Sequence, residues 1–354
     1  MHIFKHKFVA IVLWPFSFLY YLVILMRNWA YDVGIFKTFS LNAKIISIGN
    51  ISVGGTGKTP ATIFLASAIQ NAGYRVAILS RGYGRVSKAN VLVSTGAGPL
   101  CHPSEAGDEP CLMAQKTHGI PILVDRDRVH GGELLIEQFS PDVIVLDDGF
   151  QHRRLRRDLD IVLLEKPQGN FGGFLLPAGP FREPISSLKR AHFTFLAEKS
   201  TVRSTQIDAY QKKINRHSRS TVYPYQKKIQ GIIFPEIGER QPATLLEGKR
   251  IIALSGIANP LSFQHFLNDA GALIVREYQL KDHAVYDQHL VDAIIAQYHE
   301  TQAEMLITTE KDWVKLSSFS ELRELKVGLL EIAFHTEYAA LQDILQQIRG
   351  MKSR

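Results

Sequence analysis

The sequence predicts an α/β fold: a mostly parallel sheet with helices on both faces, joined to a smaller second α/β domain and an apolar N-terminal helix. One observation behind this prediction is a strand, loop, helix and strand in succession. The β-branched run at 43–53 leads into a glycine-rich loop, and the stretch at 61–84 begins as an amphipathic helix, stops at Gly73 and continues as a second strand. The other observation is a series of short apolar runs typical of parallel strands, at 122–124, 143–146, 161–164 and 193–195.

The length of 354 residues favours two globular units, and the composition indicates where they meet. The chain becomes rich in Lys, Arg, Ser and Pro around 215–249, which we interpret as a crossing hairpin or linker. A second alternation of strands and helices follows, with helices expected at 261–270 and 289–298. The predicted organisation is an N-terminal membrane-anchoring helix at 1–35, a core domain at 36–222, a linker or hairpin at 223–249 and a second α/β domain at 250–354.

The composition is that of an ordinary folded protein with a basic balance. A formal charge of +7 favours an acidic partner, which could be nucleic acid, a nucleotide or an anionic membrane surface. The two cysteines, Cys101 and Cys111, form no Cys-x-x-Cys pair, and no His/Cys cluster has zinc spacing. This cysteine usage indicates a reducing compartment and no structural metal.

The N-terminal run at 8–26 has Ser17 as its only polar side chain and is close to the ~20 apolar residues of a membrane-spanning helix. Basic residues flank it, and Trp and Tyr residues supply anchors for headgroup depth. A cleaved signal is disfavoured because no Ala-x-Ala site precedes Arg27. A buried core helix, a true span and a helix lying in the membrane interface all remain open.

Residues 52–59, SVGGTGKT, follow the Walker A pattern of a phosphate-binding loop, or P-loop, of the NTPase type. The glycines let backbone N–H groups close around phosphate oxygens at a helix N-terminus. Lys58 is expected to bridge the terminal phosphates and Thr59 to ligate Mg²⁺, although the usual first glycine is replaced here by Ser52. The expected nucleotide-binding residues are Ser52, Val53, Gly54, Gly55, Thr56, Gly57, Lys58 and Thr59.

Two adjacent acids, Asp147 and Asp148, follow the apolar run at 143–146. A carboxylate at the end of such a strand is the usual second partner of the metal at a P-loop. Adjacent residues of a strand point to opposite faces, so the two acids cannot both point inward. We expect one of them to orient Mg²⁺ or its water and the other to fix the turn, with a simple turn cap as the alternative for both.

Transfer to a hydroxyl acceptor requires a base and cations near the moving phosphoryl group. The candidate bases are Asp108 in EAGDEP and His283 in LKDHAVYD, each of which could instead be a surface or capping residue. The candidate cations could equally belong to a solvated face. They are Arg81, Arg85, Arg126, Arg128, the HRRLRR run at 152–157 and Arg182.

Six motifs occur along the chain in a fixed order: GNISVGGTGKTP, LSRGYGR, GDEP, LDDGFQHRRLRRDLDI, LLPAGPFREP and TTEKDWVKL. Together they resemble the tetraacyldisaccharide 4′-kinases of lipid A biosynthesis, from the apolar N-terminus to about residue 316. The resemblance implies transfer of the γ-phosphate of ATP, with Mg²⁺, to the 4′-hydroxyl of a tetraacylated glucosamine disaccharide 1-phosphate, giving lipid IVA. It implies an anionic glycolipid substrate at the cytoplasmic face of a Gram-negative inner membrane, and no obligate protein partner is evident. Nucleic acid is not expected as a partner, because the aromatic residues do not interleave with the basic run.

The resemblance also implies roles for matching positions. Asp108 would act as the base, helped by His283, while Asp147 and Asp148 would be the acidic partners of the metal. The sugar and phosphate side would be lined by Arg81, Arg128, Gln151, His152, Arg182 and Glu183. The chain departs from the family pattern at Ala284, where a second histidine is usual, and at Trp313, where a small residue is common.

Asp108 and His283 lie on opposite sides of the predicted linker. We therefore expect the pair to be completed when the second domain closes over the nucleotide, which would limit hydrolysis of ATP by water. The alternative function is a membrane-bound switch ATPase or GTPase. The sequence argues against it, because the loop lacks the extra lysine of the dimerising ATPases and TEKDW does not fit the guanine motif of GTPases.

Overall fold

The computed structural model describes residues 7–165, 173–198 and 204–351. The strands are β1 (Lys44–Gly49), β2 (Val76–Ser80), β3 (Val91–Ser94), β4 (Ile122–Val124), β5 (Val143–Asp147), β6 (Leu159–Leu164), β7 (Phe193–Ala197), β8 (Thr221–Phe234), β9 (Glu239–Gln241), β10 (Arg250–Ser255), β11 (Leu273–Gln279), β12 (Met305–Thr309) and β13 (Val327–Thr336). The α-helices are α1 (Lys7–Asp32), α2 (Lys58–Asn71), α3 (Pro103–Ala106), α4 (Asp108–Lys116), α5 (Arg128–Phe139), α6 (Ser204–Asn215), α7 (Pro260–Asp269), α8 (Gln288–Glu300), α9 (Glu310–Leu316) and α10 (Tyr338–Gly350).

The described strands form one 13-stranded sheet in the order β11-β10-β12-β13-β8-β7-β6-β1-β5-β2-β4-β3, with β9 paired to β8. The antiparallel pairs are β3–β4, β8–β9 and β8–β13, and the remaining neighbours are parallel. Strands such as β5 are buried along their whole length because helices cover both faces, which explains their continuous apolar runs. The prediction of a mostly parallel α/β sheet is confirmed.

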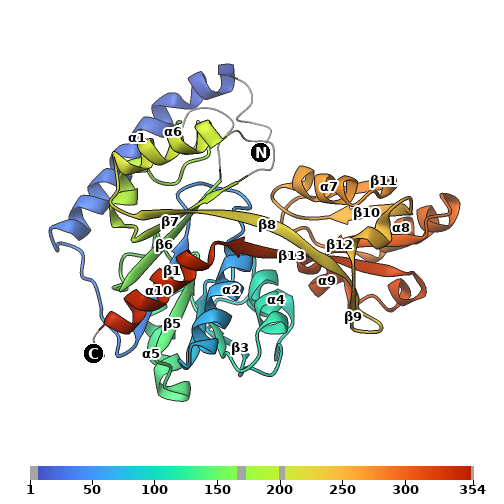
Figure 1. Ribbon diagram of the computed structural model, residues 1–354, viewed down its shortest axis with the longest axis horizontal. Helices are drawn as coiled ribbons and strands as arrows, with labels where there is room; N and C mark the ends of the chain where they lie inside the picture. The colour runs from blue at the N-terminus through green and yellow to red at the C-terminus, as the bar shows by residue number, and fades with distance from the viewer. Residues whose placement is uncertain (1–6, 166–172, 199–203, 352–354) are drawn as a thin grey trace.

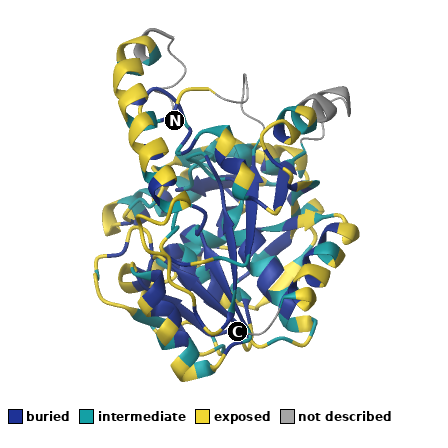
Figure 2. Ribbon diagram, turned by 90° about the vertical axis from the view of Figure 1, so that its left-hand side faces the viewer, coloured by how far each residue is buried: buried dark blue, intermediate teal, exposed yellow. Residues whose placement is uncertain are grey.

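Two lobes share this sheet (Figure 1). The core lobe contains β1 to β7. Helices α2, α4 and α10 cover one of its faces, and α5 covers the other. The second lobe contains β10, β11 and β12, with α8 and α9 on one face and α7 on the other. Figure 2 shows the buried strands running through the centre of the molecule, inside helices whose outer surfaces are exposed. The two lobes are therefore joined by a single β-sheet.

Two long strands connect the lobes. In Figure 1, β8 runs from the core lobe to the second lobe, and β13 returns beside it. The predicted hairpin around 215–249 is thus the end of β8 together with β9, which pair as antiparallel strands. Because β8 also pairs with β7, the sheet continues from one lobe into the other without interruption.

The C-terminal end of the chain differs from the predicted second domain at 250–354. Helix α10 packs on the core lobe beside α2, and the end of β13 joins the same core through Phe334. The reason is the apolar stripe formed by Ala340, Ile344 and Ile348, which are fully buried at helical spacing. The second lobe therefore begins after the linker, but the C-terminal helix α10 belongs to the core lobe.

Helix α1 is the one described helix that is long and apolar enough to cross a membrane, over Ala10–Asp32. Only 11% of its most apolar window is buried inside the protein, which argues against the core-helix interpretation. Large side chains such as Ile11, Phe16, Leu19 and Met26 are more than half exposed. The few buried side chains of α1 face the core lobe, where Tyr20 and Tyr21 contact an apolar cluster.

The position of α10 can be tested by substitution. Ile344→Ala removes a fully buried side chain and should lower the free energy of unfolding by about 2–5 kcal/mol. Chemical denaturation of the purified protein measures this quantity. Gln346→Ala, on the exposed side of the same helix, is the matched control and should change stability little. Equal stability of the two variants would contradict the packing of α10 on the core lobe.

Candidate active site

The P-loop connects β1 to the start of α2 in the core lobe. Gly54 and Gly57 have positive φ angles of 122° and 78°, a conformation that side chains disfavour, so these two positions require glycine. Within the loop, Asn50 Nδ2 donates to Thr56 Oγ1 at 3.0 Å. Since Lys58 is the first residue of α2, the loop places backbone N–H groups and the positive end of a helix together, as an anion site requires.

Side chains from β8 hold the outer edge of the P-loop. Tyr225 donates its hydroxyl hydrogen to the Thr56 carbonyl at 2.8 Å, and Lys227 Nζ donates to the Gly55 carbonyl at 3.1 Å. Lys227 also pairs with Glu165 at 2.6 Å. Neither residue was predicted from the sequence, because both lie in the segment interpreted as a linker. The strand that connects the lobes is thus in direct contact with the phosphate loop.

Asp147 and Asp148 point in different directions, as the strand geometry predicts. Asp147, at the end of β5, is buried and accepts a hydrogen bond from Ser80 Oγ at 2.9 Å. Asp148 has a positive φ of 47° and turns its carboxylate toward Arg182, at 2.9 Å, and Lys58, at 3.8 Å. The two carboxylates therefore have separate partners, although they are neighbours in sequence.

The surroundings give the two acids opposite pKa shifts. Burial raises the pKa of Asp147, and the charges of Glu109 and Asp148 add to this effect. Burial acts in the same direction on Asp148, but Lys58 and Arg182 outweigh it and hold the pKa of Asp148 below its usual value. Asp148 is thus a carboxylate balanced by protein cations, whereas at Asp147 burial and the two nearby carboxylates outweigh the charge of Lys58.

Asp108 and His283 meet across the two lobes. His283 Nδ1 lies 3.2 Å from Asp108 Oδ2, with Asp108 at the start of α4 and His283 in the loop before α8. His283 has a positive φ of 59° and packs against the core-lobe turn at 81–85. A Cβ at Gly84 would come within van der Waals contact of the imidazole, 3.4 Å from Nδ1, and the centre of the Tyr83 ring lies 5.1 Å from that of the imidazole. The structure therefore brings both predicted bases into one site.

Two lysines of α9 join this contact. Lys315 Nζ lies 3.0 Å from Asp108 Oδ2, and Lys311 Nζ pairs with Glu109 at 3.2 Å and with Asp282 at 2.8 Å. Burial raises the pKa of Asp108, but His283, Lys315 and Lys311 together hold it below its usual value. Lys311 and Lys315 are four residues apart and therefore share one face of α9, but this spacing does not indicate which residues that face contacts.

The residues predicted for the sugar and phosphate side differ in exposure. Glu183 is fully buried and pairs with Arg190 at 2.9 Å. Its carboxylate also accepts hydrogen bonds from Asn28 Nδ2 at 3.1 Å and from Gln151 Nε2 at 3.0 Å. In this arrangement Glu183 orients Gln151 and the end of α1 from beneath the surface.

Arg128 is also buried, with 2% of its surface exposed, and donates to the Asp125 carbonyl at 2.9 Å. Burial lowers its pKa to about 10, so the side chain remains charged at neutral pH. Burial, helped by the nearby charge of Arg128, lowers the pKa of His152 to about 4, which leaves that imidazole neutral. Arg81 is exposed. The fixed cation Arg128 thus lies below the surface of the site, and Arg81 lies at the surface.

The basic run at 152–157 is largely structural. Arg153 pairs with Asp32 at 2.7 Å, Arg154 with Asp127 at 2.6 Å, and Arg157 with Asp160 at 3.1 Å. Of the other candidate cations, Arg85 is buried and Arg126 is exposed. Most of the positive charge in this run is therefore balanced within the protein.

Helix α1 contacts the same region as the predicted sugar-side residues. The Tyr20 hydroxyl donates to the Arg182 carbonyl at 3.0 Å, and Arg27 donates to the Gln151 carbonyl. Asn28 reaches Glu183 as described above. The apolar helix thus ends beside residues that are predicted to line the sugar and phosphate side.

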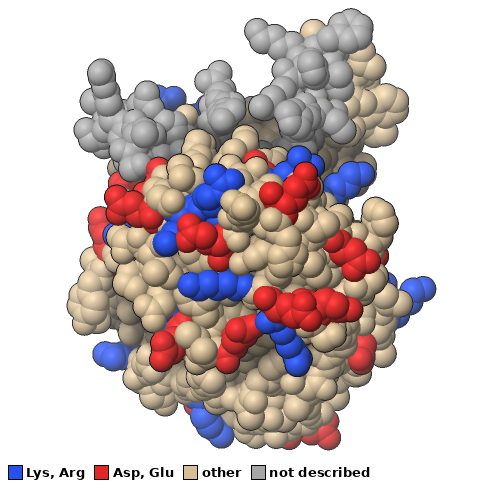
Figure 3. Space-filling view, turned by 90° about the vertical axis from the view of Figure 1, so that its right-hand side faces the viewer, with Lys and Arg blue, Asp and Glu red and all other residues tan. Residues whose placement is uncertain are grey.

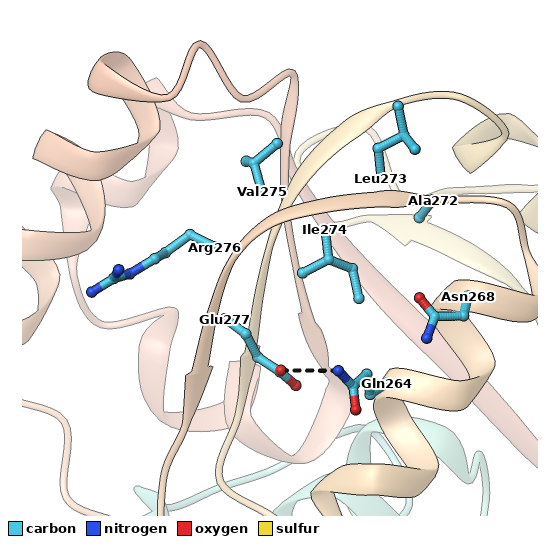
Figure 4. A pocket seen from close by; sticks show the side chains of 8 residues that line it. All are labelled: Gln264, Asn268, Ala272, Leu273, Ile274, Val275, Arg276 and Glu277. Atoms are coloured by element: carbon cyan, nitrogen blue, oxygen red, sulfur yellow. Dashed lines mark hydrogen bonds between the residues drawn. The ribbon is translucent and has the colours of Figure 1, made fainter.

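Two further features belong to the second lobe: its outer face and a hollow beside α7. On the outer face of the second lobe, acidic and basic side chains are mixed, so the net positive charge is not gathered there (Figure 3). A hollow of about 570 Å³ between α7 and β11 shares no residue with the P-loop or with the Asp108–His283 contact (Figure 4). Its polar contact joins Gln264 to Glu277 at 3.2 Å. Among the described residues, no group of three or more His, Cys, Asp and Glu side chains could hold a metal by itself.

Comparison with known proteins gives a consistent result. A sequence model of the tetraacyldisaccharide-1-P 4′-kinase family matches residues 9–349. A tetraacyldisaccharide 4′-kinase of Syntrophus aciditrophicus is 40% identical over 88% of this chain and 86% of its own length. One from Geobacter metallireducens is 37% identical, over 92% of this chain and 95% of its own length.

A solved structure agrees with these relatives. The crystal structure of LpxK from Aquifex aeolicus in complex with ATP is 31% identical and has a TM-score of 0.76, covering 97% of this chain and 99% of its own. With the family match spanning nearly the whole sequence, this chain belongs to the tetraacyldisaccharide-1-P 4′-kinase family.

Proposed function

We propose that this chain transfers the γ-phosphate of ATP to the 4′-hydroxyl of a tetraacyldisaccharide 1-phosphate and so produces lipid IVA. Family membership supports the class of reaction, and the ATP complex of the Aquifex relative supports the phosphate donor. The observation that carries the proposal in this chain is the Asp108–His283 contact at the start of α4, a helix that packs against the P-loop helix α2, because a kinase needs a base close to the γ-phosphate. Glu109, next to Asp108, is near enough to Asp147 to raise its pKa.

The chemistry follows from the positions of these side chains. The acceptor O–H bond breaks as its proton moves to Asp108, a new bond forms between that oxygen and the γ-phosphorus, and the bond to the β-phosphate oxygen breaks to release ADP. His283 orients Asp108. Lys58 and the P-loop N–H groups stabilise the negative charge on the transferred group. Arg81, Arg128, Gln151, His152 and Arg182 hold or orient the sugar and its phosphate, and the buried Glu183 positions Gln151.

The residues at the end of β5 fit a magnesium ion. Mg²⁺ in nucleotide sites keeps several waters and takes one or two protein oxygens together with phosphate oxygens. Thr59 and Asp147 offer a hydroxyl and a carboxylate of this kind. Burial disfavours the ionised form of Asp147, as expected for a carboxylate whose counter-charge is a metal. Asp148, paired with Arg182 and Lys58, would assist from the side. The ion would neutralise charge on the phosphates when bound.

Helix α1 supports a membrane location for the acceptor. Its exposed apolar side chains match the acyl chains of the substrate, and its polar contacts end at Gln151, Glu183 and Arg182. We infer that α1 anchors the chain at the cytoplasmic face of the inner membrane of a Gram-negative bacterium. The lipid would then reach the site along the helix, while ATP enters from the aqueous side.

The proposed reaction is tested by incubating labelled ATP with tetraacyldisaccharide 1-phosphate in detergent micelles. We expect a labelled lipid product. Lys58→Ala should lower its rate of formation by about 10²–10³-fold, because a cation at the transferred phosphate is lost. Lys249→Ala removes a lysine that pairs with Glu304 on the surface of the second lobe, and it should leave the rate unchanged. ATP turnover with no lipid product would contradict the proposal and favour a switch ATPase.

The base is tested separately. Asp108→Asn keeps the shape of the side chain but cannot take a proton, so the kcat of lipid phosphorylation should fall by about 10²–10⁴-fold. Binding of ATP, measured by calorimetry, should be retained. Asp142→Asn changes an exposed carboxylate that pairs with Arg75, and it should leave kcat near that of the native protein. If Asp108→Asn retains most of its activity, Asp108 is not the base.

A further inference from the structure

We propose that Lys315 is a positioning residue of this site, whose ammonium group ties Asp108 of the core lobe to the second-lobe loop that carries His283. The inference rests on the proposed function, because it concerns the base of that reaction. It assigns a role to a residue of the TTEKDWVKL motif that neither the loop chemistry nor the acidic pair explains.

Lys315 has partners in both lobes. Its Nζ lies 3.0 Å from Asp108 Oδ2 on α4 and donates to the Ala284 carbonyl at 2.9 Å. The same nitrogen lies 5.1 Å from the centre of the Tyr286 ring, three residues after His283 in the chain. An ammonium group has three N–H donors, and here they serve a carboxylate, a carbonyl and an aromatic face. Only 16% of the side chain is exposed, so water competes weakly for these contacts.

The loop that carries His283 depends on such a contact. His283 adopts a positive φ of 59°, which is unfavourable for a histidine unless its surroundings impose it. Between His283 and the buried Tyr286, Val285 is 87% exposed and Ala284 has only a methyl group, so these two side chains contribute little to the shape of the loop. The Ala284 N–H donates to the Lys281 carbonyl at 3.0 Å, and the hydrogen bond from Lys315 to the Ala284 carbonyl adds a second restraint on the residue immediately after the histidine.

The position of Lys315 within its helix supports this role. Helix α9 begins with Thr309 as its cap, and Asp312 anchors the first turn by accepting hydrogen bonds from Tyr286 and from the Gly256 backbone. Lys311, one turn before Lys315, pairs with Glu109 and Asp282. Helices α4 and α9 lie side by side in Figure 1. Lys315 is thus held on a short rigid segment that faces the start of α4.

The contacts that His283 and Lys315 make with Asp108 leave one of its two carboxylate oxygens unused. His283 Nδ1 and Lys315 Nζ both engage Oδ2 of Asp108, so neither contact uses Oδ1. With Oδ2 held from two directions, Oδ1 is the oxygen that can take the proton of the acceptor. A lysine that bound both oxygens would instead compete with the acceptor.

The role of Lys315 can be measured through its effect on the pKa of Asp108. The groups that face Asp108 are His283, Lys315, Lys311 and Tyr286 from the second lobe, with Cys111 on its own helix and Glu109 paired with Lys311. Lys315 is one of the cations that offset burial and keep the pKa of Asp108 low. Removing its charge raises that pKa. Because Asp108 acts in its ionised form, the acidic limb of the rate profile moves to higher pH.

The test compares Lys315→Gln, Lys315→Arg and the control Lys249→Gln in the lipid phosphorylation assay across pH. Lys315→Gln should lower kcat at neutral pH by roughly 10–100-fold, because a base misplaced by about 1 Å costs a factor of this size. Its acidic limb should move to higher pH, and its KM for ATP should stay near the native value. Lys315→Arg keeps the charge and should keep the native acidic limb. Lys249→Gln should match the native profile.

Other results would overturn the inference. A Lys315→Gln profile with the native pH dependence, whether at full or reduced activity, would show that Lys315 does not act through Asp108. A displaced acidic limb in Lys315→Arg would do the same, and it would decide the matter even if Lys315→Gln did not fold. If the native protein itself makes no lipid product, the proposed function fails and the role of Lys315 fails with it. A native product with an unaffected Lys315→Gln profile removes only the present inference.

Discussion

The contact between helices α4 and α9 is the constraint on which the site depends. Asp108 and Glu109 at the start of α4 face Lys315 and Lys311 of α9, and all four charged groups are largely shielded from water. A buried carboxylate without a counter-charge is costly, so each lobe stabilises a group that the other lobe supplies. Asp108 and His283, the pair proposed to act as the base, meet at this contact. If they act together, the active arrangement requires both lobes in position.

The connecting strands extend the same coupling to the nucleotide. Tyr225 and Lys227 of β8 hold the carbonyls of Thr56 and Gly55, and β13 returns to the core lobe, where Phe334 packs beneath α2. The strand that carries the second lobe is therefore bonded to the loop that binds phosphate. A change in the angle between the lobes would act on the P-loop and on the base together, which is how a kinase could keep ATP from water until the lipid arrives.

The parts of the site that could be predicted from the sequence are those formed by residues close together along the chain. The P-loop needs particular residues at fixed spacing, and the acidic pair follows an apolar strand, so both could be located without a structure. The partnership of Asp108 and His283, 175 positions apart, came from a resemblance to a family rather than from any pattern in the residues. Tyr225, Lys227 and Lys315 were missed because their roles arise only when distant segments meet. The burial of Glu183 and Arg128, and the return of α10 to the core lobe, likewise depend on tertiary packing.

The most direct measurement of the central claim is a double-mutant cycle on Asp108→Asn and His283→Asn, read as kcat/KM for lipid phosphorylation. Residues that act as one unit have effects that do not add. If the pair works across the lobes as one unit, the double variant should be little slower than the slower single variant. Two losses that multiply in the double variant would show that Asp108 and His283 act independently, and would contradict a base assembled from both lobes.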